Sequence, residues 1–339
     1  MKQEFDNMPK SENQKQKLLY LLKFFYEETD EDHPLTVNEI IAKLNQNGIS
    51  AARRSIYDDI RTLQDFGIDI VMRKNKTCAY FLGSRLFETS ELKILIDSIQ
   101  SSRFITKKKS ESIIKRLKQL ASKPQARSFS GQIYIYDRIK SMNESILYNV
   151  DTLHNAIAAN RRITFRYFDY NIKREKVFRK NGELYSADPL ALTFDNENYY
   201  LISYHHKYEG YVHYRVDKMT DIHISSEKRS IPNERFNAAA YVKPMFFMFD
   251  GEIEQITALF HISYLNIILD RFGDNVILHE TEDAECFQAT FKAAVSPTFL
   301  SWIMGFGSGA LILSPQWVAD ELKRLSLETA EMYTDMEES

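Results

Sequence analysis

The chain has few cysteines, no long apolar run and little net charge, and each absence excludes a class of protein. Its two cysteines, Cys78 and Cys286, lie far apart in sequence, so we expect neither a disulfide framework nor a zinc site. No apolar stretch approaches the roughly 20 residues that span a bilayer, and the first residues lack the apolar core of a signal peptide. We therefore expect a cytoplasmic protein with no membrane partner.

The charges are unevenly distributed although their sum is small. The formal net charge of −3 does not by itself favour nucleic acid as a partner. Between residues 50 and 85, however, seven Lys or Arg stand against four Asp or Glu. A local excess of this size predicts weak non-specific binding to DNA, with affinity recovered through dimerisation and base contacts.

The length of 339 residues is too great for one ordinary core, and the hydrophobic periodicity changes along the chain. The predicted fold class is therefore multidomain α+β. We predict a winged helix-turn-helix domain over residues 1–85, a helical connector with dimer contacts over 86–150, a strand-rich domain over 151–230 and a C-terminal extension over 231–339.

The first of these parts has the pattern of three short helices followed by a hairpin. Thr36 and Glu39 form a capping-box pair at the start of the second helix, and Asn47-Gly48 ends it with a tight turn. The third helix is predicted over residues 50–66. Residues 68–82 then alternate apolar and polar around a basic tip, as a two-stranded wing does. Two short helices joined by a glycine turn predict a helix-turn-helix.

The third helix of such a fold enters the major groove, where arginines read guanine or hold phosphates and hydroxyl groups fix the register. We expect this helix and the wing tip to bind a double-stranded DNA operator. The predicted contacts are Arg53, Arg54, Ser55, Tyr57, Asp58, Arg61, Arg73, Lys74 and Lys76. The alternative is that these charges form an ordinary solvated surface.

The connector has helical periodicity in two stretches. Thr89 is predicted to cap the first helix, and the second begins at Lys107 with three consecutive lysines, which oppose the helix dipole. That run could contact DNA backbone, but a solvated helix end is the commoner outcome. Residues 122–130 have the composition of a linker.

Beyond residue 160 the periodicity becomes that of strands separated by short turns, which favours a compact barrel or half-open sandwich. The predicted strands cover residues 163–168, 174–179, 183–188, 191–194, 199–204, 212–216 and 222–225. In the strand before Lys218, residues His213, Arg215 and Asp217 are expected to point the same way. A strand with an arginine on a polar face is either solvated or suited to an anion.

An anionic effector, such as a nucleotide or a nucleic-acid end, requires arginine forks, hydroxyl donors and aromatic planes. The candidates in this domain are Tyr167, Tyr185, Tyr200, Ser203, His205, His206, Tyr208, His213, Arg215, Asp217 and Lys218. Three alternatives remain. The segment 199–201 could be core, Asp217 could pair with a neighbouring cation, and the histidines could bind metal, although no carboxylate or cysteine stands at a ligand spacing.

The C-terminal part has the predicted order β-α-β-α-β-α, which favours a small ferredoxin-like unit. The glycine-rich stretch 305–309 ends a helix rather than following a strand, so it does not have the setting of a nucleotide loop. Arg271 and Arg324 are weaker ligand candidates. The very apolar stretch 238–249 is expected to be a loop that packs against a partner.

Several of these motifs resemble the WYL-domain family of bacterial transcription regulators. Tyr199-Tyr200-Leu201 stands where the family has Trp-Tyr-Leu, and residues 214–218 are similar to its Phe-Arg-Leu-Asp-Arg stretch. Residues 54–60 resemble the Arg-Thr-Ile-Tyr-Arg-Asp-Ile signature, with Asp58 in place of an arginine, and Tyr208 stands where many members have another arginine.

The resemblance implies an N-terminal winged helix, a WYL barrel of the Sm or SH3 type and a C-terminal WCX extension. It makes Tyr200, Arg215, Asp217 and Lys218 the positions that match the family most closely. We therefore predict a homodimeric regulator that binds operator DNA and a nucleotide or single-stranded nucleic acid effector, without cofactor or enzymatic activity. The alternatives are a nucleic-acid-processing enzyme, for which no HxH, DxD or Ser-x-x-Lys constellation is present in a convincing setting, and an RNA-binding module.

Overall fold

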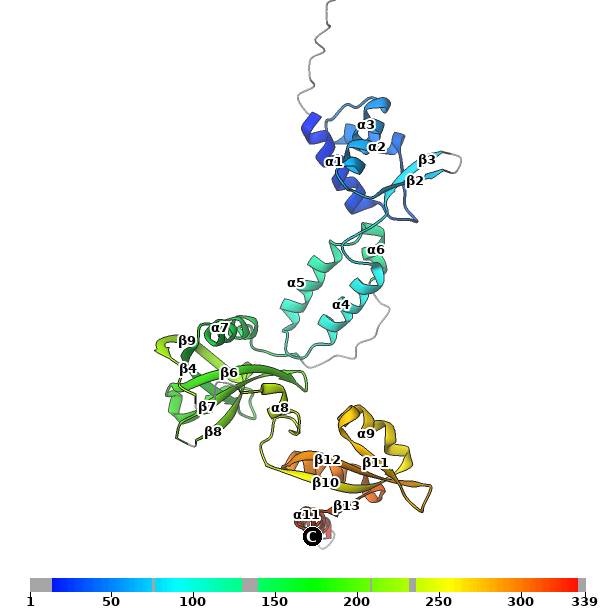
Figure 1. Cartoon of the computed structure of the whole chain (residues 1–339). Helices are drawn as coiled ribbons and strands as arrows, with labels where there is room; N and C mark the ends of the chain where they lie inside the picture. Colours follow the sequence, from blue (N-terminus) through cyan, green and yellow to red (C-terminus); the bar gives the residue numbers. More distant parts are fainter. Residues whose placement is uncertain (1–13, 75–76, 130–139, 208, 232–235, 335–339) are drawn as a thin grey trace, which may run out of the picture. The chain divides into compact units, whose positions relative to one another are not determined.

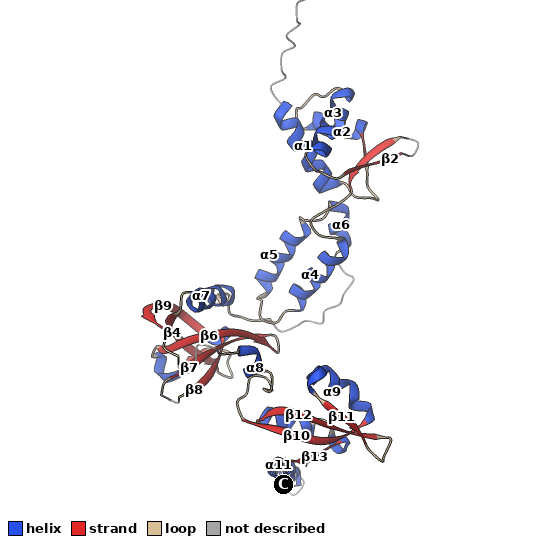
Figure 2. Cartoon of the chain, in the orientation of Figure 1, coloured by secondary structure: helices blue, strands red, loops and turns tan. Residues whose placement is uncertain are grey.

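The computed structural model describes residues 14–74, 77–129, 140–207, 209–231 and 236–334, which belong to two compact units (Figure 1). The first unit is Met1–Glu144 and the second is Ser145–Ser339. Figure 2 shows that helices dominate the first unit and strands the second, so the protein is a multidomain α+β chain. Among the described residues, no helix is both long and apolar enough to cross a membrane.

The head, residues 14–85, consists of three helices and a small antiparallel sheet. Its elements are α1 (Gln14–Glu28), β1 (Leu35–Thr36), α2 (Val37–Gln46), α3 (Arg53–Asp65), β2 (Ile70–Lys74) and β3 (Cys78–Leu82). The sheet order is β1-β3-β2, so the predicted two-stranded hairpin gains a third, very short strand. The Glu39 amide donates to Thr36 Oγ1 at 3.3 Å, and the Thr36 amide donates to Glu39 Oε2 at 2.7 Å. These two bonds confirm the predicted capping box.

The helices of the head enclose one apolar core. Helices α1, α2 and α3 contribute fully buried side chains at helical spacing, as expected for amphipathic helices. They include Leu21, Phe25, Ile40, Leu44, Ile56 and Ile60. This core fixes the orientation of α3, whose opposite face is left to solvent.

The connector, residues 86–129, is a helical hairpin followed by a short helix. Its helices are α4 (Thr89–Ser101), α5 (Lys107–Lys118) and α6 (Lys123–Ser128). The predicted cap at Thr89 was wrong by one residue, because Glu88 caps α4 in a capping box with Glu91. The predicted linker was also wrong, because Ser122 and Gln125 form a capping box that starts α6, and Pro124 is tolerated in a first helical turn.

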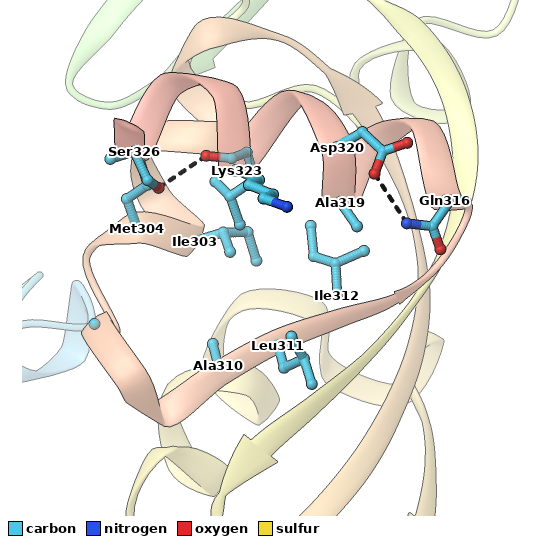
Figure 3. Close-up of a pocket in the computed structure, with 12 residues that line it drawn as sticks. Ile303, Met304, Ala310, Leu311, Ile312, Gln316, Ala319, Asp320, Lys323 and Ser326 are labelled. Carbon is cyan, nitrogen blue, oxygen red and sulfur yellow. Dashed lines mark hydrogen bonds between the residues drawn. The ribbon is translucent and has the colours of Figure 1, made fainter. Parts of the chain in front are cut away.

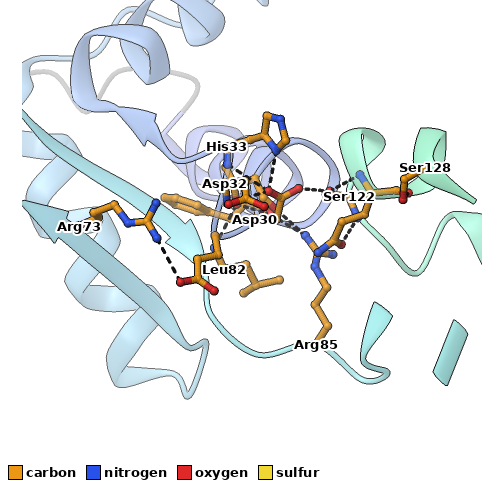
Figure 4. Close-up of polar contacts among 12 residues, drawn as sticks. Asp30, Asp32, His33, Arg73, Leu82, Arg85, Ser122 and Ser128 are labelled. Carbon is orange, nitrogen blue, oxygen red and sulfur yellow. Dashed lines mark hydrogen bonds and ion pairs between the residues drawn. The ribbon is translucent and has the colours of Figure 1, made fainter. Parts of the chain in front are cut away.

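A buried polar network joins the connector to the head (Figure 4). The Asp30 carboxylate, which is 5% exposed, accepts hydrogen bonds from Ser122 Oγ and from the His33 amide. The Arg85 guanidinium donates to the carbonyls of Tyr26 at 2.8 Å and Thr29 at 2.6 Å. Carbonyls at a helix end have no intrahelical partner, so Arg85 satisfies the end of α1.

The second unit begins with a curled six-stranded sheet and a covering helix. Its elements are α7 (Ile146–Ala158), β4 (Arg161–Tyr170), β5 (Lys176–Phe178), β6 (Tyr185–Asp195), β7 (Asn198–His205), β8 (Gly210–Arg215) and β9 (Met219–Lys228), with two short 3-10 turns at Arg179–Gly182 and Val216–Lys218. The strand path is β5-β4-β6-β7-β8, and β9 pairs with β4. Because β4 pairs with β5, β6 and β9, the sheet bends around it.

Two details of this curled sheet differ from the prediction. The strands predicted over 183–188 and 191–194 are the single strand β6, whose pairing with β7 shifts register between Pro189 and Ala191. A bulge is a usual place for proline, which has no amide to donate. Helix α7 packs on the sheet through Leu153 and Ala156, which are fully buried.

The remaining part of the second unit is a four-stranded sheet with three helices. Its elements are β10 (Glu252–His261), α9 (Leu265–Phe272), β11 (Ile277–Glu280), β12 (Cys286–Val295), α10 (Pro297–Met304), β13 (Ala310–Ser314) and α11 (Gln316–Thr334), with 3-10 turns at Ile262–Tyr264, Gly273–Asn275 and Gly307–Gly309. The sheet order is β11-β12-β10-β13. The prediction missed β11, an edge strand whose four residues are all exposed, so it lacks the alternation that signals a strand.

The apolar stretch predicted over 238–249 lies between the two sheets of this unit. It starts with the short helix α8 (Ala238–Val242). Met245 and Met248 are buried against Tyr200 and Ile202 of β7 and against Ala294 of β12. One face of strand β7 is therefore covered by this segment.

Candidate functional site

The predicted DNA-contacting residues of α3 form an exposed basic face. Arg53, Arg54 and Arg61 are exposed, and Arg53 Nε donates to the Tyr57 hydroxyl at 3.2 Å. Ala52, the N-cap of α3, gives no side-chain cap, and the first turn holds no acidic residue. The first amides of α3 thus remain available, together with the positive end of the helix dipole, for a phosphate.

Other predicted contacts of the head have partners within it. Ser55 accepts a hydrogen bond from Lys17 Nζ, which also pairs with Asp59 at 2.7 Å, so Ser55 faces α1. Arg73 pairs with Glu31 at 3.1 Å and lies over the Phe81 ring. Asp58 and Lys74 are exposed, while Lys76 lies outside the described residues.

In the curled sheet, Arg215 is the centre of a polar cluster at the end of β8. Its guanidinium forms a two-point contact with Asp217, Nε to Oδ1 at 3.1 Å and Nη2 to Oδ2 at 2.9 Å. Nη2 also donates to Asn198 Oδ1 at 2.9 Å. Asp217 does not continue the strand as predicted, because β8 ends at Arg215 and the 3-10 turn folds Asp217 back onto it.

A second cluster gathers around the Asp169 carboxylate of β4. Lys218 Nζ approaches Asp169 Oδ1 at 2.5 Å, and Arg179 Nε approaches Oδ2 at 2.5 Å. These bonds outweigh burial and lower the pKa of Asp169. Lys180 Nζ lies 4.2 Å from the centre of the Tyr185 ring. The residues Lys180 and Asn181 have positive φ angles of 49° and 52°, a backbone conformation that non-glycine residues rarely adopt.

Tyr167 connects the two clusters. Its hydroxyl accepts the Arg215 amide at 3.2 Å, and the Arg179 guanidinium lies 5.3 Å from the centre of its ring. Burial raises the pKa of Tyr167 to about 12, so it remains a neutral phenol. We define the Tyr167 site as Tyr167, Asp169, Lys176, Arg179, Lys180, Arg215, Asp217 and Lys218.

Charge and aromatic groups at this site suit an anion with an attached ring. Five of its members are cationic and two are carboxylates, so the site is positive overall. Tyr170 and Phe178, each 39% exposed, present aromatic planes beside Phe168, and Lys176 lies 4.4 Å from the centre of the Phe168 ring. Cations that hold phosphate and exposed rings that stack a base are the usual means of binding nucleotides.

Several predicted effector residues lie elsewhere. Ser203 is fully buried and donates to the Asp188 carbonyl at 2.8 Å. Tyr200 is 8% exposed and packs on Met245 and Met248, which agrees with the alternative that it belongs to the core. His213 lies on the same covered face next to Tyr241, and burial lowers its pKa.

The rest of the predicted set is not part of the Tyr167 site either. His206 Nε2 lies 2.6 Å from Asp188 Oδ2, and Arg162 donates to the other oxygen of the same carboxylate. His205 occupies the end of β7, and Tyr208 lies outside the described residues. Within the described ranges, no group of three His, Cys, Asp or Glu residues is placed to hold a metal ion.

Four site residues were missed from the sequence: Asp169 and the three cations Lys176, Arg179 and Lys180. The signal that could have found the three cations is the charge run over residues 173–180, which has five Lys or Arg and one Glu. The weaker candidates Arg271 and Arg324 have structural partners. Arg271 donates to the Met245 carbonyl at 2.7 Å, and Arg324 pairs with Glu321 at 2.6 Å.

A cavity of about 610 Å³ lies in the C-terminal part, away from the predicted residues (Figure 3). Its walls are α10, β13 and α11, and they are apolar at Ile303 and Ile312. On its rim, Gln316 donates to Asp320 at 2.9 Å. It gathers no cluster of cations or aromatic rings, so the Tyr167 site remains the better candidate for an anion.

Family models match three parts of the chain. The WYL domain matches residues 148–224, the WCX domain matches residues 252–329, and the D3 domain of FokI matches residues 19–75. The WYL match includes the whole Tyr167 site, and the FokI D3 match includes α3. A search of curated proteins finds no similar sequence.

Two solved structures show remote similarity. One is the proteasome accessory factor B/C of Arthrobacter aurescens, with 16% identity and a TM-score of 0.26 over 91% of this chain and 47% of that one. This chain thus spans about half the length of that protein. The other is a CRISPR Cas-related protein, with 14% identity and a TM-score of 0.37 over 73% of this chain and 72% of that one. The assignment rests on the domain models and not on these two structures: the chain belongs to the WYL-domain family and carries a WCX domain after its WYL domain.

Proposed function

We propose that the protein is a ligand-responsive, DNA-binding transcriptional regulator whose WYL domain binds a nucleotide or another nucleic-acid-like anion. The observation that carries the proposal is the Tyr167 site, where five cations and two carboxylates surround aromatic side chains in the WYL domain. The exposed basic face of α3 supports the DNA-binding half of the proposal.

Within this scheme we assign a winged helix-turn-helix fold to the head, an Sm-like or SH3-like barrel to the WYL domain and a ferredoxin-like fold to the WCX domain. Three features support these assignments: the β2–β3 hairpin after α3, which pairs with β1, the bend of the sheet at β4, and the strand order β11-β12-β10-β13. The proposed domain limits are 1–85, 86–150, 151–230 and 231–339.

An effector would bind at the Tyr167 site by displacing the carboxylates that now bind its cations. Asp169 and Asp217 occupy the donors of Arg179, Lys218 and Arg215, as a phosphate would. A phosphate with two negative charges competes with one carboxylate for these donors. Once bound, its base can stack on Tyr170 or Phe178.

The DNA-binding half requires two heads, because one recognition helix covers only a few base pairs. A homodimer would place two such helices in successive major grooves about 34 Å apart. Coupling to the effector requires only that the filled Tyr167 site favour one arrangement of the two heads.

The DNA-binding half is tested with the triple variant Arg53→Ala/Arg54→Ala/Arg61→Ala in an electrophoretic shift assay on duplexes selected from a random pool. We expect at least tenfold weaker binding, because each lost arginine removes a phosphate or base contact worth about 1 kcal/mol or more. The control is Lys173→Ala/Lys228→Ala/Lys292→Ala, which removes three exposed charges from the second unit. Equal affinity of the two triple variants would contradict the assignment of α3.

The effector half is tested with a fluorescent 5′-phosphorylated single-stranded oligonucleotide as the probe. Arg179→Ala/Lys218→Ala should weaken binding of the probe, whereas Asp169→Asn should strengthen it, because the competing carboxylate is removed. The matched control is Asp221→Asn, since Asp221 is also a partly exposed carboxylate paired with an arginine, Arg166, at 3.2 Å. Weaker binding by Asp169→Asn would contradict the exchange mechanism.

A further inference from the structure

The connector has a large local excess of positive charge. Residues 86–129 contain ten Lys or Arg and four Asp or Glu, although the whole chain is negative. Helix α5 alone has six Lys or Arg and one acidic residue, Glu111. This charge belongs neither to the recognition helix nor to the Tyr167 site.

The exposed face of α5 presents its cations in a line. Ser110 is buried, and Ile113 and Leu117 lie on the same side of the helix and turn toward α4. On the opposite side, Lys108 and Lys115 are separated by seven residues, nearly two turns, and are both exposed. They are about 10 Å apart along the helix axis, and Arg116, about 100° further around the helix, widens this exposed basic face.

These cations lack the partners that other cations of the protein have. Within the described ranges, no ion pair involves Lys108, Lys115 or Arg116, whereas Lys123 in the next helix pairs with Glu27 at 3.0 Å. Lys107 and Lys108 stand in the first turn of α5, where the helix dipole disfavours positive charge. The arrangement costs stability in the free protein, and a bound polyanion would recover it.

We propose that this face of α5, the connector ridge of Lys108, Lys115 and Arg116, binds the phosphate backbone of duplex DNA that flanks the operator. A spacing of about 10 Å along α5 corresponds to about three base-pair steps, so several cations can contact phosphates of one strand. An anionic membrane fits less well, because the apolar face of α5 is packed on α4 and is not available to lipid.

The link between connector and head makes such binding effective. Ser122 fixes the connector to Asp30 at the end of α1, and Arg85, the last residue of the head, binds the same end of α1. When α3 is bound in the major groove, this joint keeps the ridge in the same complex as the DNA, so even weak phosphate contacts act at a high effective concentration. This inference rests on the proposed DNA binding by the head and extends its footprint.

The test compares two duplexes with the full-length protein. One is an operator selected from a random pool and trimmed to the shortest duplex that α3 still binds, and the other carries 15 additional base pairs of arbitrary sequence on each side. The variant is Lys108→Gln/Lys115→Gln/Arg116→Gln, and Lys108→Arg/Lys115→Arg/Arg116→Lys keeps the charge. The control Lys173→Gln/Lys228→Gln/Lys292→Gln removes three exposed lysines from the second unit.

For the wild type, we expect the extended duplex to bind more tightly, with a steeper loss of affinity as salt rises. The glutamine variant should bind the trimmed duplex normally and lose the additional affinity for the extended one. Three lost phosphate contacts lower the slope of log affinity against log salt by about 2.7, which is about a 40-fold difference over a fourfold rise in salt. The charge-keeping variant should behave as the wild type.

Three results would overturn the proposal. Equal binding of both duplexes by the wild type would show that flanking DNA is not contacted. An equal loss on both duplexes would show that the ridge only supports the head. A loss in the charge-keeping variant as large as in the glutamine variant would show that the positive charge of the ridge is not what binds the extended duplex. If the wild type bound no duplex at all, DNA binding by the head would fail as well, which separates that failure from the first three.

Discussion

Replacing Ser122 by alanine should loosen the joint between the head and the connector. Ser122 is fully buried and has two roles: its hydroxyl accepts the Gln125 amide at 3.1 Å as the cap of α6, and it donates to the Asp30 carboxylate. The loss of an N-cap costs about 1 kcal/mol, and a hydrogen bond to a charged group contributes about 1.5–3 kcal/mol.

The expected total is about 2–3 kcal/mol, below the sum of the upper values, because Asp30 keeps its bonds from the His33 and Asp32 amides. That energy corresponds to an increase of about 30- to 150-fold in the opening constant of α6. Since a chain with several domains does not unfold in one step, the measurement is hydrogen exchange of the α6 amides, such as Ala126, which bonds to the Ser122 carbonyl at 2.8 Å.

The matched control is Ser128→Ala at the other end of α6. Ser128 is exposed and donates only to the Gln125 carbonyl, so its loss should change exchange by less than about threefold. Similar exchange in the two alanine variants would show that the buried bond to Asp30 adds no net stability, and the account of the joint would be wrong.

Three further predictions concern other parts of the chain. Thr36→Ala should lower the opening free energy of α2 by about 1 kcal/mol in hydrogen exchange of the α2 amides, because the capping box is lost; no change would contradict its role. Leu153→Ala should lower the opening free energy of α7 by about 2–5 kcal/mol in hydrogen exchange of the α7 amides, because Leu153 fills the interface of α7 with the sheet; an effect no larger than that of Leu327→Ala, on the exposed side of α11, would be inconsistent. Burial acts to raise the pKa of Asp188, but the bonds from Arg162 and His206 lower it on balance, so its contribution is present above about pH 4 and is lost as the pH falls further. Asp188→Asn should therefore reduce stability at pH 7 and have progressively less effect toward pH 2; an equal effect at both pH values would rule out the carboxylate charge as the cause.

The elements that could be predicted from the sequence are those specified by residues close together in the chain. The capping box of Thr36 and the apolar stripes of α2 and α3 depend only on neighbours within one or two turns, so sequence spacing was sufficient. Helix α6 was missed because residues 122–130 have the composition of a linker, which conceals the Ser122–Gln125 capping box that starts the helix. Strand β11 was missed because an exposed edge strand need not alternate.

The candidate site could be predicted only in part, because it depends on contacts between distant segments. Arg215, Lys218 and Tyr167 were predicted from strand alternation and from family resemblance. Arg179 joins them through Asp169, which stands on another strand, and no local pattern specifies that pairing. The fold-back of Asp217 onto Arg215 follows from the 3-10 turn that ends β8, and strand alternation cannot anticipate it.

The pairing of cations distinguishes the two modes of anion binding that we propose for this chain. In the WYL domain, Arg215 and Arg179 are paired with carboxylates, so an incoming anion must displace a carboxylate. Only a ligand with more negative charge or a well-placed ring gains binding free energy from this exchange. On α3 and α5, Arg54, Arg61 and Lys115 are exposed and form no ion pair within the described ranges, so a polyanion gains from counterion release without displacing a protein group. The first mode gives selectivity for a small effector with weak salt dependence. The second gives strong salt dependence with little selectivity, which suits contacts along a DNA backbone.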